Sequence, residues 1–553
     1  MPCSKMLRRS ACALVLLLSS CAGGRADTAS PPSLSLYSAF MAGRYAAATG
    51  HETTAARFYA DAIALDPDNR TLLRQGFITA LLARSPDATM LAKRMGNDPL
   101  AILVRGNALI EAGHDRKAAT LFAKMPATGV TGLIRPLLLA WSDAGAGRFG
   151  PAIDRLTGLD AGSPFGPVYT LNAALIADLA GREAEAAPLY RAAEQAFASP
   201  NLRLAQAIAS FQARQGHFQS ADAILVRLAA THPDLRLALR RMERDAAKPM
   251  ITSAQDGVAE VYLTLAGSLD QPQQVLLRQI LLGFALQLRP DLAAASLLLA
   301  NLDVTLHHPE RAAATLTRIG ADDPLYGPAL MQRAQILAGL GKAMPLLPAL
   351  ADLARTHPHD AAPITLAADI ERDAGHYRRA RRLYSQALAR LGPNPPGEAW
   401  AVYYGRAIAE DKLHDWPAAD ADLHHALALQ PGQPFVLNYL GYSDALRGVD
   451  LAQAQTMIEE ALQVDPNEGA IIDSLGYVLL REGKIAQAMR TQIRAVQEAP
   501  DDAEVNAHLA DIFEAAGDHL AARNQWVRAL ALHPDAAEAA RIEAHLKHDA
   551  AGS

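Results

Sequence analysis

Cysteine is nearly absent from this chain of 553 residues. All three cysteines lie within the first 21 residues, at Cys3, Cys12 and Cys21. Everything downstream therefore lacks the thiols needed for a disulfide, a thiolate metal site or a cysteine nucleophile.

Aromatic residues are scarce, and positive charge is not in excess. Aromatic residues make up 5% of the chain, whereas hydrophobic residues make up 50%, and much of that share is Ala and Leu. Such a composition favours closely packed helices over β-sandwiches, so we expect an all-α fold. The formal net charge is -6 and no long basic stripe occurs, so we expect no nucleic-acid partner.

The common catalytic and cofactor-binding motifs do not occur either. The chain has no Gly-rich phosphate loop ending in Gly-Lys-Ser/Thr and no Gly-x-Ser-x-Gly elbow. The stretch HETTA at 51–55 resembles the zinc motif H-E-x-x-H, but Ala55 replaces its second histidine. We therefore expect no cofactor, no metal site and no enzyme activity.

Paired titratable residues are the remaining candidates for chemistry. The pairs considered are His307-His308, His357 with His359, His424-His425, Asp322-Asp323, Glu459-Glu460 and Asp501-Asp502. Adjacent residues on a helix point apart, and carboxylates near helix ends favour the helix dipole or solvent. Turn and surface positions explain these pairs better than metal binding or acid–base catalysis.

The N-terminus reads as a secretory signal. Basic residues at Lys5, Arg8 and Arg9 precede an apolar run over 11–18 that is too short to span a bilayer. The run leads into Leu-Ser-Ser-Cys, which resembles the bacterial lipobox and implies cleavage of residues 1–20 and lipidation of Cys21. The alternatives are an ordinary signal peptide cut near Ala26 and an uncleaved anchor.

The residues after the lipobox indicate where the protein resides. Residue 22 is Ala, whereas an Asp there would resemble the inner-membrane retention signal of Gram-negative lipoproteins. Residues 21–35 are rich in Gly, Ala, Ser and Pro, a composition typical of a flexible tether. We expect a lipid-anchored protein of the outer membrane that faces the periplasm.

The remaining sequence is repetitive. NYLGYSDALRG at 438–448 returns as DSLGYVLLREG at 473–483, 35 residues later. Prolines mark the same period, at Pro431, Pro466, Pro500 and Pro534. A fixed period of this length predicts a solenoid.

Each unit contains two helical segments separated by a glycine such as Gly448 or Gly483. Small residues recur where two helices must cross closely; they are Gly441, Gly476 and Ala510 in the first segment and Ala454, Ala488 and Ala522 in the second. These units resemble the tetratricopeptide repeat, which implies a right-handed α-solenoid of helix-turn-helix hairpins. We count roughly 13 to 15 units.

The period lapses once. Residues 235–258 break helical continuity at Lys248-Pro249 and Asp256-Gly257. We interpret this segment as an irregular joint. The predicted arrays and end are an N-terminal array at 36–234, a C-terminal array at 259–536, and a capping helix and tail at 537–553.

The resemblance also implies a binding surface. Positions 2, 5, 9, 12 and 13 of a tetratricopeptide unit line the concave face. In the C-terminal repeats the matching residues are Tyr404, Asp411, Lys412, Asn438, Tyr442, Asp473, Tyr477, Arg481 and Asp511. The alternative for Tyr442 and Tyr477 is that they only pack between neighbouring repeats.

As a whole, the chain resembles tetratricopeptide-repeat lipoproteins of the Gram-negative cell envelope. The resemblance implies a non-catalytic scaffold that binds protein or peptide partners in envelope biogenesis, secretion or cell-wall assembly. One alternative is a regulator of an envelope enzyme. Another is a peptidase or glycan-processing enzyme with a site in the irregular segment, for which no motif is present.

Overall fold

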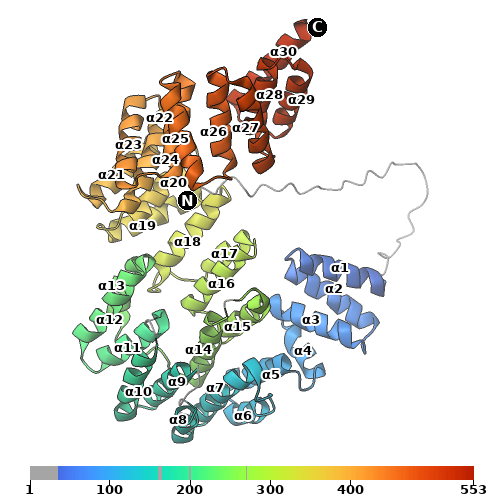
Figure 1. Ribbon diagram of the computed structural model, residues 1–553. Helices are drawn as coiled ribbons and strands as arrows, with labels where there is room; N and C mark the ends of the chain where they lie inside the picture. The colour runs from blue at the N-terminus through green and yellow to red at the C-terminus, as the bar shows by residue number, and fades with distance from the viewer. Residues whose placement is uncertain (1–34, 160–164, 198–200, 270, 553) are drawn as a thin grey trace. The chain divides into compact units, whose positions relative to one another are not determined.

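The computed structural model describes residues 35–159, 165–197, 201–269 and 271–552. Within these ranges every regular element is a helix, and most successive helices pair into hairpins that stack on one another (Figure 1). This confirms the predicted all-α solenoid of helix-turn-helix repeats. The predicted signal peptide, Cys21 and all of the predicted tether except its last residue lie outside the described residues.

Packing divides the chain into unit 1, residues 1–346, and unit 2, residues 347–553. The helices of unit 1 are α1 (Leu36–Ala48), α2 (Glu52–Leu65), α3 (Arg70–Leu82), α4 (Asp87–Arg94), α5 (Pro99–Glu111), α6 (Asp115–Phe122), α7 (Gly129–Gly145), α8 (Phe149–Thr157), α9 (Gly166–Leu179), α10 (Glu183–Ala196), α11 (Leu202–Arg214), α12 (Phe218–Thr231), α13 (Arg236–Asp245), α14 (Ala254–Gly267), α15 (Val275–Leu288), α16 (Ala293–Thr305), α17 (Pro309–Leu316) and α18 (Tyr326–Gly339). Those of unit 2 are α19 (Leu347–Thr356), α20 (Ala362–Asp373), α21 (Tyr377–Leu391), α22 (Trp400–Asp411), α23 (Trp416–Leu429), α24 (Pro434–Arg447), α25 (Leu451–Val464), α26 (Gly469–Arg481), α27 (Ile485–Glu498), α28 (Ala503–Ala515), α29 (His519–Ala531) and α30 (Ala536–Gly552). Short 3₁₀ turns lie at η1 (Pro233–Leu235), η2 (Pro272–Gln274), η3 (Met344–Leu346) and η4 (Gly397–Ala399).

The hairpin of α26 and α27 shows why the repeat residues recur. A Cβ atom on Gly476 would lie 2.2 Å from Oε1 of Gln492 on α27, so a side chain at this position would displace the Gln492 amide. Gly483 ends α26 with φ of 76°, and the N–H of Lys484 reaches back to the Leu479 carbonyl at 2.9 Å. This left-handed turn reverses the chain into α27.

In unit 1 the first helices of several hairpins pack on α14 and α15, two helices from further along the chain. Helix α14 packs against α5, α7 and α9, and α15 packs against α3 and α5. A Cβ atom on Gly257 of α14 would lie 2.2 Å from the ring of Trp141 on α7. The inner face of the N-terminal hairpins is therefore occupied by the same chain.

This arrangement differs from the predicted division into arrays. Residues 235–258 do not separate two bodies, because α13 packs on α12 and α18 while α14 lies among the N-terminal hairpins. The boundary between the compact units lies between Leu346 and Leu347 instead. The physical reason is that α14 is apolar on nearly all sides, and such a helix must be buried.

The first hairpin of unit 1 also meets a much later one. Arg311 on α17 pairs with Glu52 on α2 and, at 2.8 Å, with Asp303 on α16. At the same place the imidazole of His308 fills the space where a Cβ atom of Gly50 would lie. These contacts join segments more than 250 residues apart.

Unit 2 is a regular stack of hairpins that ends with α30. The side chain of Ile542 is buried against α29, and the ring of His545 stacks on Trp526 at 4.7 Å. Helix α30 thus covers the last hairpin over the range predicted to hold a capping helix. None of the helices in the described ranges has the length and apolar character needed to cross a membrane.

Candidate functional site

The nine residues predicted to line a groove all belong to the first helices of unit 2 hairpins or their ends. Tyr404 and Asp411 lie on α22 with Lys412 just after it, Asn438 and Tyr442 lie on α24, Asp473, Tyr477 and Arg481 lie on α26, and Asp511 lies on α28. Their side chains divide into two clusters, two exposed cations and one separate carboxylate.

The first cluster is built around two tyrosines on adjacent first helices. The rings of Tyr442 and Tyr477 meet edge to face with centroids 5.3 Å apart. The Tyr442 hydroxyl lies 3.0 Å from Oε1 of Glu504, to which it donates a hydrogen bond, and Tyr477 lies 5.0 Å from the ring of His508. Burial, together with the nearby carboxylates of Glu504 and Asp473, raises the pKa of Tyr442. Both tyrosines therefore pack between repeats and remain half-buried.

A buried ion pair lies beneath these rings. Nδ1 of His508 is 2.9 Å from Oδ2 of Asp473, and both residues are buried. Gln492 on α27 donates one hydrogen bond to Asp473 and another, at 2.9 Å, to the Val505 carbonyl. Burial alone would lower the pKa of His508, but the charge and hydrogen bond of Asp473 raise this pKa to about 9. His508 is therefore protonated at neutral pH.

This pair changes the role assigned to one predicted residue. Asp473 was expected on the open concave surface, whereas its carboxylate faces the interior contact of α26, α27 and α28. The sequence analysis did not single out His508. The available signal was the spacing of 35 residues between Asp473 and His508, which places them on first helices of adjacent hairpins.

The second cluster lies on α22 and α24. Tyr404 and Tyr439 meet edge to face with centroids 5.8 Å apart, and the Tyr439 hydroxyl donates to Oδ2 of Asp411 at 2.8 Å. Burial raises the pKa of Tyr404 to about 12. On α24, Oδ1 of Asn438 is buried with no hydrogen-bond partner among the described residues.

The remaining predicted residues differ in whether their side chains are exposed or held by other parts of the chain. Lys412 and Arg481 are exposed, and Arg481 donates to the Ala445 carbonyl at 2.9 Å, near the C-terminal end of α24. Asp511 accepts hydrogen bonds from Nε1 of Trp526 at 3.0 Å and from Arg541 at 2.7 Å. Asp511 thus fixes α30 in place, and its charge also acts on His508 of the first cluster.

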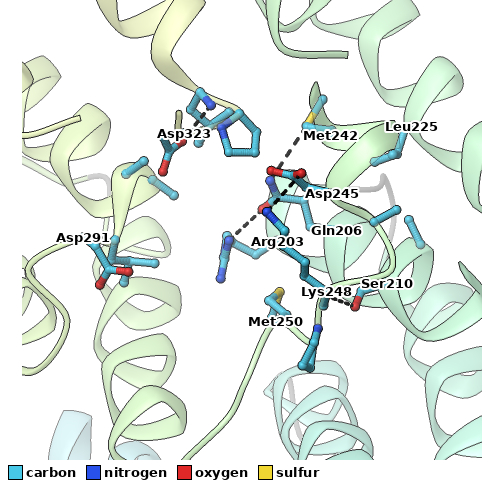
Figure 2. Close-up of a pocket in the computed structure, with 18 of the residues that line it drawn as sticks. Arg203, Gln206, Ser210, Leu225, Met242, Asp245, Lys248, Met250, Asp291 and Asp323 are labelled. Atoms are coloured by element: carbon cyan, nitrogen blue, oxygen red, sulfur yellow. Dashed lines mark hydrogen bonds and ion pairs between the residues drawn. The ribbon is translucent and has the colours of Figure 1, made fainter. Parts of the chain in front are cut away.

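Unit 1 contains a cavity of about 380 Å³ that the sequence analysis did not identify. Its lining comes from α11, α12, α13, the segment between α13 and α14, and the loops before α16 and α18. Figure 2 shows Asp291 and Asp323 on one side and Met242, Leu225 and Asp245 on the other. The signal for this cavity was the lapse of the repeat period at 235–258, since that segment supplies part of the wall.

The arginines of this cavity are already paired. Nε of Arg203 donates to the buried carboxylate of Glu260 at 3.0 Å, and Arg289 lies 3.4 Å from the same group. Burial, together with the charges of Asp291 and Asp245, raises the pKa of Asp323. The one hydroxyl in the lining, that of Ser210, donates to the Lys248 carbonyl at 2.7 Å.

No metal centre is assembled in the part of the chain that the structure describes. Within it, no three His, Cys, Asp or Glu side chains converge closely enough to hold an ion. The cavity lining contains no histidine that could serve as a base for Ser210.

Sequence comparison gives one short relationship. No protein-family model matches the chain. A TPR repeat-containing protein of Pseudomonas aeruginosa is 36% identical over 110 residues, which are 20% of this chain and 18% of that protein. The match therefore spans less than a fifth of the relative's length.

Solved structures with similar helices include three of low sequence identity. Yeast Tom70 has a TM-score of 0.36 and 13% identity, with 94% of this chain and 96% of that chain covered. A chain of the APC/C hetero-tetramer Cut9-Hcn1 has a TM-score of 0.37 and 14% identity, with 92% of this chain and 89% of that chain covered. A tetratricopeptide repeat protein of Parabacteroides merdae has a TM-score of 0.37 and 17% identity, with 45% of this chain and 95% of that chain covered. The helix-turn-helix hairpins of this chain and the sequence match are both similar to tetratricopeptide repeats.

Proposed function

We propose that this chain is a non-catalytic scaffold of the cell envelope that binds a protein or peptide partner along the first helices of unit 2. It is tethered to the outer membrane through a lipid on Cys21 and faces the periplasm. The observation that carries the binding site is the contrast between the units. In unit 1, α14 and α15 cover the first helices, whereas the described part of unit 2 has no comparable helix packed on α22, α24, α26 and α28.

The chemistry of these helices suits a peptide segment. Half-buried rings at Tyr404, Tyr442 and Tyr477 provide apolar area, and tyrosine loses little conformational entropy on binding. Lys412 and Arg481 add exposed cations, and Asn438 adds an unpaired acceptor. Aromatic anchors with a few polar groups beside them are the usual means of peptide recognition.

The lipobox-like sequence before Cys21 and the tether-like composition of 21–35 support the location. Envelope biogenesis, secretion and cell-wall assembly are all processes that such a scaffold would serve. Regulation of an envelope enzyme is a form of the same activity, since a regulator also acts by binding.

Catalysis in the unit 1 cavity is the weaker alternative. A covalent mechanism needs a nucleophile beside a base, and the Ser210 hydroxyl instead donates a hydrogen bond to a backbone carbonyl. Among the described residues, no three His, Cys, Asp or Glu side chains form a metal site beside it. Ser210 is therefore not arranged as an activated nucleophile.

Site-specific photocrosslinking in cells tests the proposed binding face. A photoreactive amino acid replaces Lys412 or Arg481 on the groove side, or Arg382 or Arg490 on the second helices α21 and α27. All four side chains are exposed and cationic, so the positions are matched. We expect discrete adducts from the groove positions alone. Equal adducts from the second helices, or adducts from those helices only, would place the partner elsewhere.

A further inference from the structure

The first described helix carries an exposed apolar face. Tyr37 and Tyr45 are each 73% exposed, and Met41 between them is 42% exposed. These residues are spaced by four and Arg44 lies beside them, so all four occupy one face of α1. The opposite face, with Ala39, Gly43 and Ala46, is buried against the rest of unit 1.

The same face is covered in repeats further along the chain. When the small residue Gly43 is aligned with Gly476, Met41 and Tyr45 correspond to Ser474 and Val478 of α26, and both of these are buried. Alignment with α28 gives His508 and Ile512, which are also buried. The preceding hairpin provides this cover, and no helix precedes α1 in the described residues. Met41 and Tyr45 of α1 are thus large side chains at positions that inner repeats bury, whereas Tyr37 aligns with Ala470 and Glu504, which are exposed.

We propose that this face of α1, formed by Tyr37, Met41, Arg44 and Tyr45, docks on the lipid surface. The proposal rests on the membrane anchorage proposed above. Leu36 follows Cys21 by only 15 residues. Fifteen residues span at most about 54 Å, whatever conformation they adopt. A lipid on Cys21 would therefore hold α1 at high effective concentration beside the bilayer.

The chemistry of α1 favours a lipid surface over a second copy of the chain. Tyrosine is enriched where a bilayer meets water, because its ring is apolar and its hydroxyl is polar. Helix α1 contains no acidic residue, and its one charge, on Arg44, suits anionic headgroups. A self-complementary contact between two copies of this face would bring two Arg44 side chains together without an acidic partner on either α1.

The experiment uses the absence of cysteine downstream of Cys21. In the mature lipidated protein Cys21 is blocked, so a cysteine introduced at Tyr37 or Tyr45 is the single reactive thiol. Each variant, Tyr37→Cys or Tyr45→Cys, is labelled with an environment-sensitive fluorophore. The labelled protein is inserted in vesicles of phosphatidylethanolamine and phosphatidylglycerol. The matched control is Leu520→Cys on α29, where the native side chain is 71% exposed.

We expect the fluorescence of labels at 37 and 45 to rise severalfold on the vesicles and to be quenched by nitroxide-bearing lipids. The label at 520 should show neither effect. Arg44→Glu should reduce quenching on vesicles that contain phosphatidylglycerol more than on vesicles without it. Unquenched labels at 37 and 45 on vesicle-bound protein would overturn the proposal, and a doubled particle mass with those labels buried would assign the face to a second copy. Failure of the anchor itself is distinguishable, because the protein without an introduced cysteine would then not pellet with vesicles, whether it keeps a free Cys21 or loses this residue by cleavage near Ala26.

Discussion

The hydroxyl of Tyr262 on α14 donates a hydrogen bond of 2.6 Å to Oδ1 of Asn107 on α5, across 155 residues of sequence. Both side chains are buried. This bond links the helix inside unit 1 to a first helix that surrounds it. It belongs to the packing by which α14 fills the inner face of the N-terminal hairpins.

Removing the Tyr262 hydroxyl should lower the stability of unit 1. In Tyr262→Phe, Oδ1 of Asn107 loses its partner in a buried place where Nδ2 of the same side chain has none among the described residues. Leaving a buried acceptor unpaired typically costs about 1–3 kcal/mol. Hydrogen exchange should therefore show lower protection in α5 and α14, with unit 2 unchanged. The exposed change Tyr37→Phe is the control, and equal loss of protection in both variants would contradict this role of the bond.

The glycine at the crossing of α26 and α27 should be equally sensitive. In Gly476→Leu the new side chain collides with Gln492, whose amide holds Asp473 and the Val505 carbonyl. Overpacking of this kind typically costs about 1–3 kcal/mol. In a stack of repeats the damage stays near its source, so unit 1 should keep its hydrogen-exchange protection. Ala470→Leu, at an exposed site on α26, should have little effect, and uniform loss of protection in both units would show that they unfold together.

The regular part of the fold was predictable because each hairpin repeats the same local requirements. A small residue at the crossing and a glycine in the turn are visible in the sequence, and the structure uses Gly476 and Gly483 as expected. The position of α14 was not predictable in this way. Its burial depends on the contact of Gly257 with Trp141, which lies 116 residues earlier in the chain, and no periodic pattern encodes such a pairing.

The candidate site, like the fold, was predictable from the sequence only in part. The period places Tyr442 and Tyr477 on first helices, and the structure places them there, in edge-to-face contact. The burial of Asp473 was missed because its cause is another residue, His508, which supplies the compensating charge. A carboxylate considered without its partner is expected to be exposed to solvent. A carboxylate that faces a protonated imidazole is stable in the interior.

The anchor gives a direct prediction. Cys21→Ser should release the protein from membranes without unfolding it, because the described helices begin well after residue 21 and none spans a bilayer. Fractionation should move the variant to the soluble periplasmic fraction, and circular dichroism should show unchanged helix content. If the variant still pelleted with outer membranes after a high-salt wash, another attachment would be responsible.

The ion pair of His508 and Asp473 predicts how the stability of unit 2 depends on pH. The pKa of His508 is about 9 in the folded chain and about 6.5 when unfolded, so the folded state binds the proton more tightly. This contribution to stability is complete below about pH 6.5 and is lost as the pH rises through about 9, with an upper bound of about 3 kcal/mol. The nearby carboxylates of Glu504 and Asp511 also raise the pKa of His508.

The measurement is urea unfolding followed by tryptophan fluorescence in a Trp141→Phe background, where the three remaining tryptophans all lie in unit 2. The free energy of unfolding should fall between pH 6.5 and 9. In His508→Gln, which keeps a donor for Asp473 but cannot carry charge, this slope should disappear. Because other groups titrate equally in both proteins, the difference between the two curves isolates His508. Parallel curves across this window would mean that His508 is neutral in the folded chain and that the contact with Asp473 is an ordinary hydrogen bond.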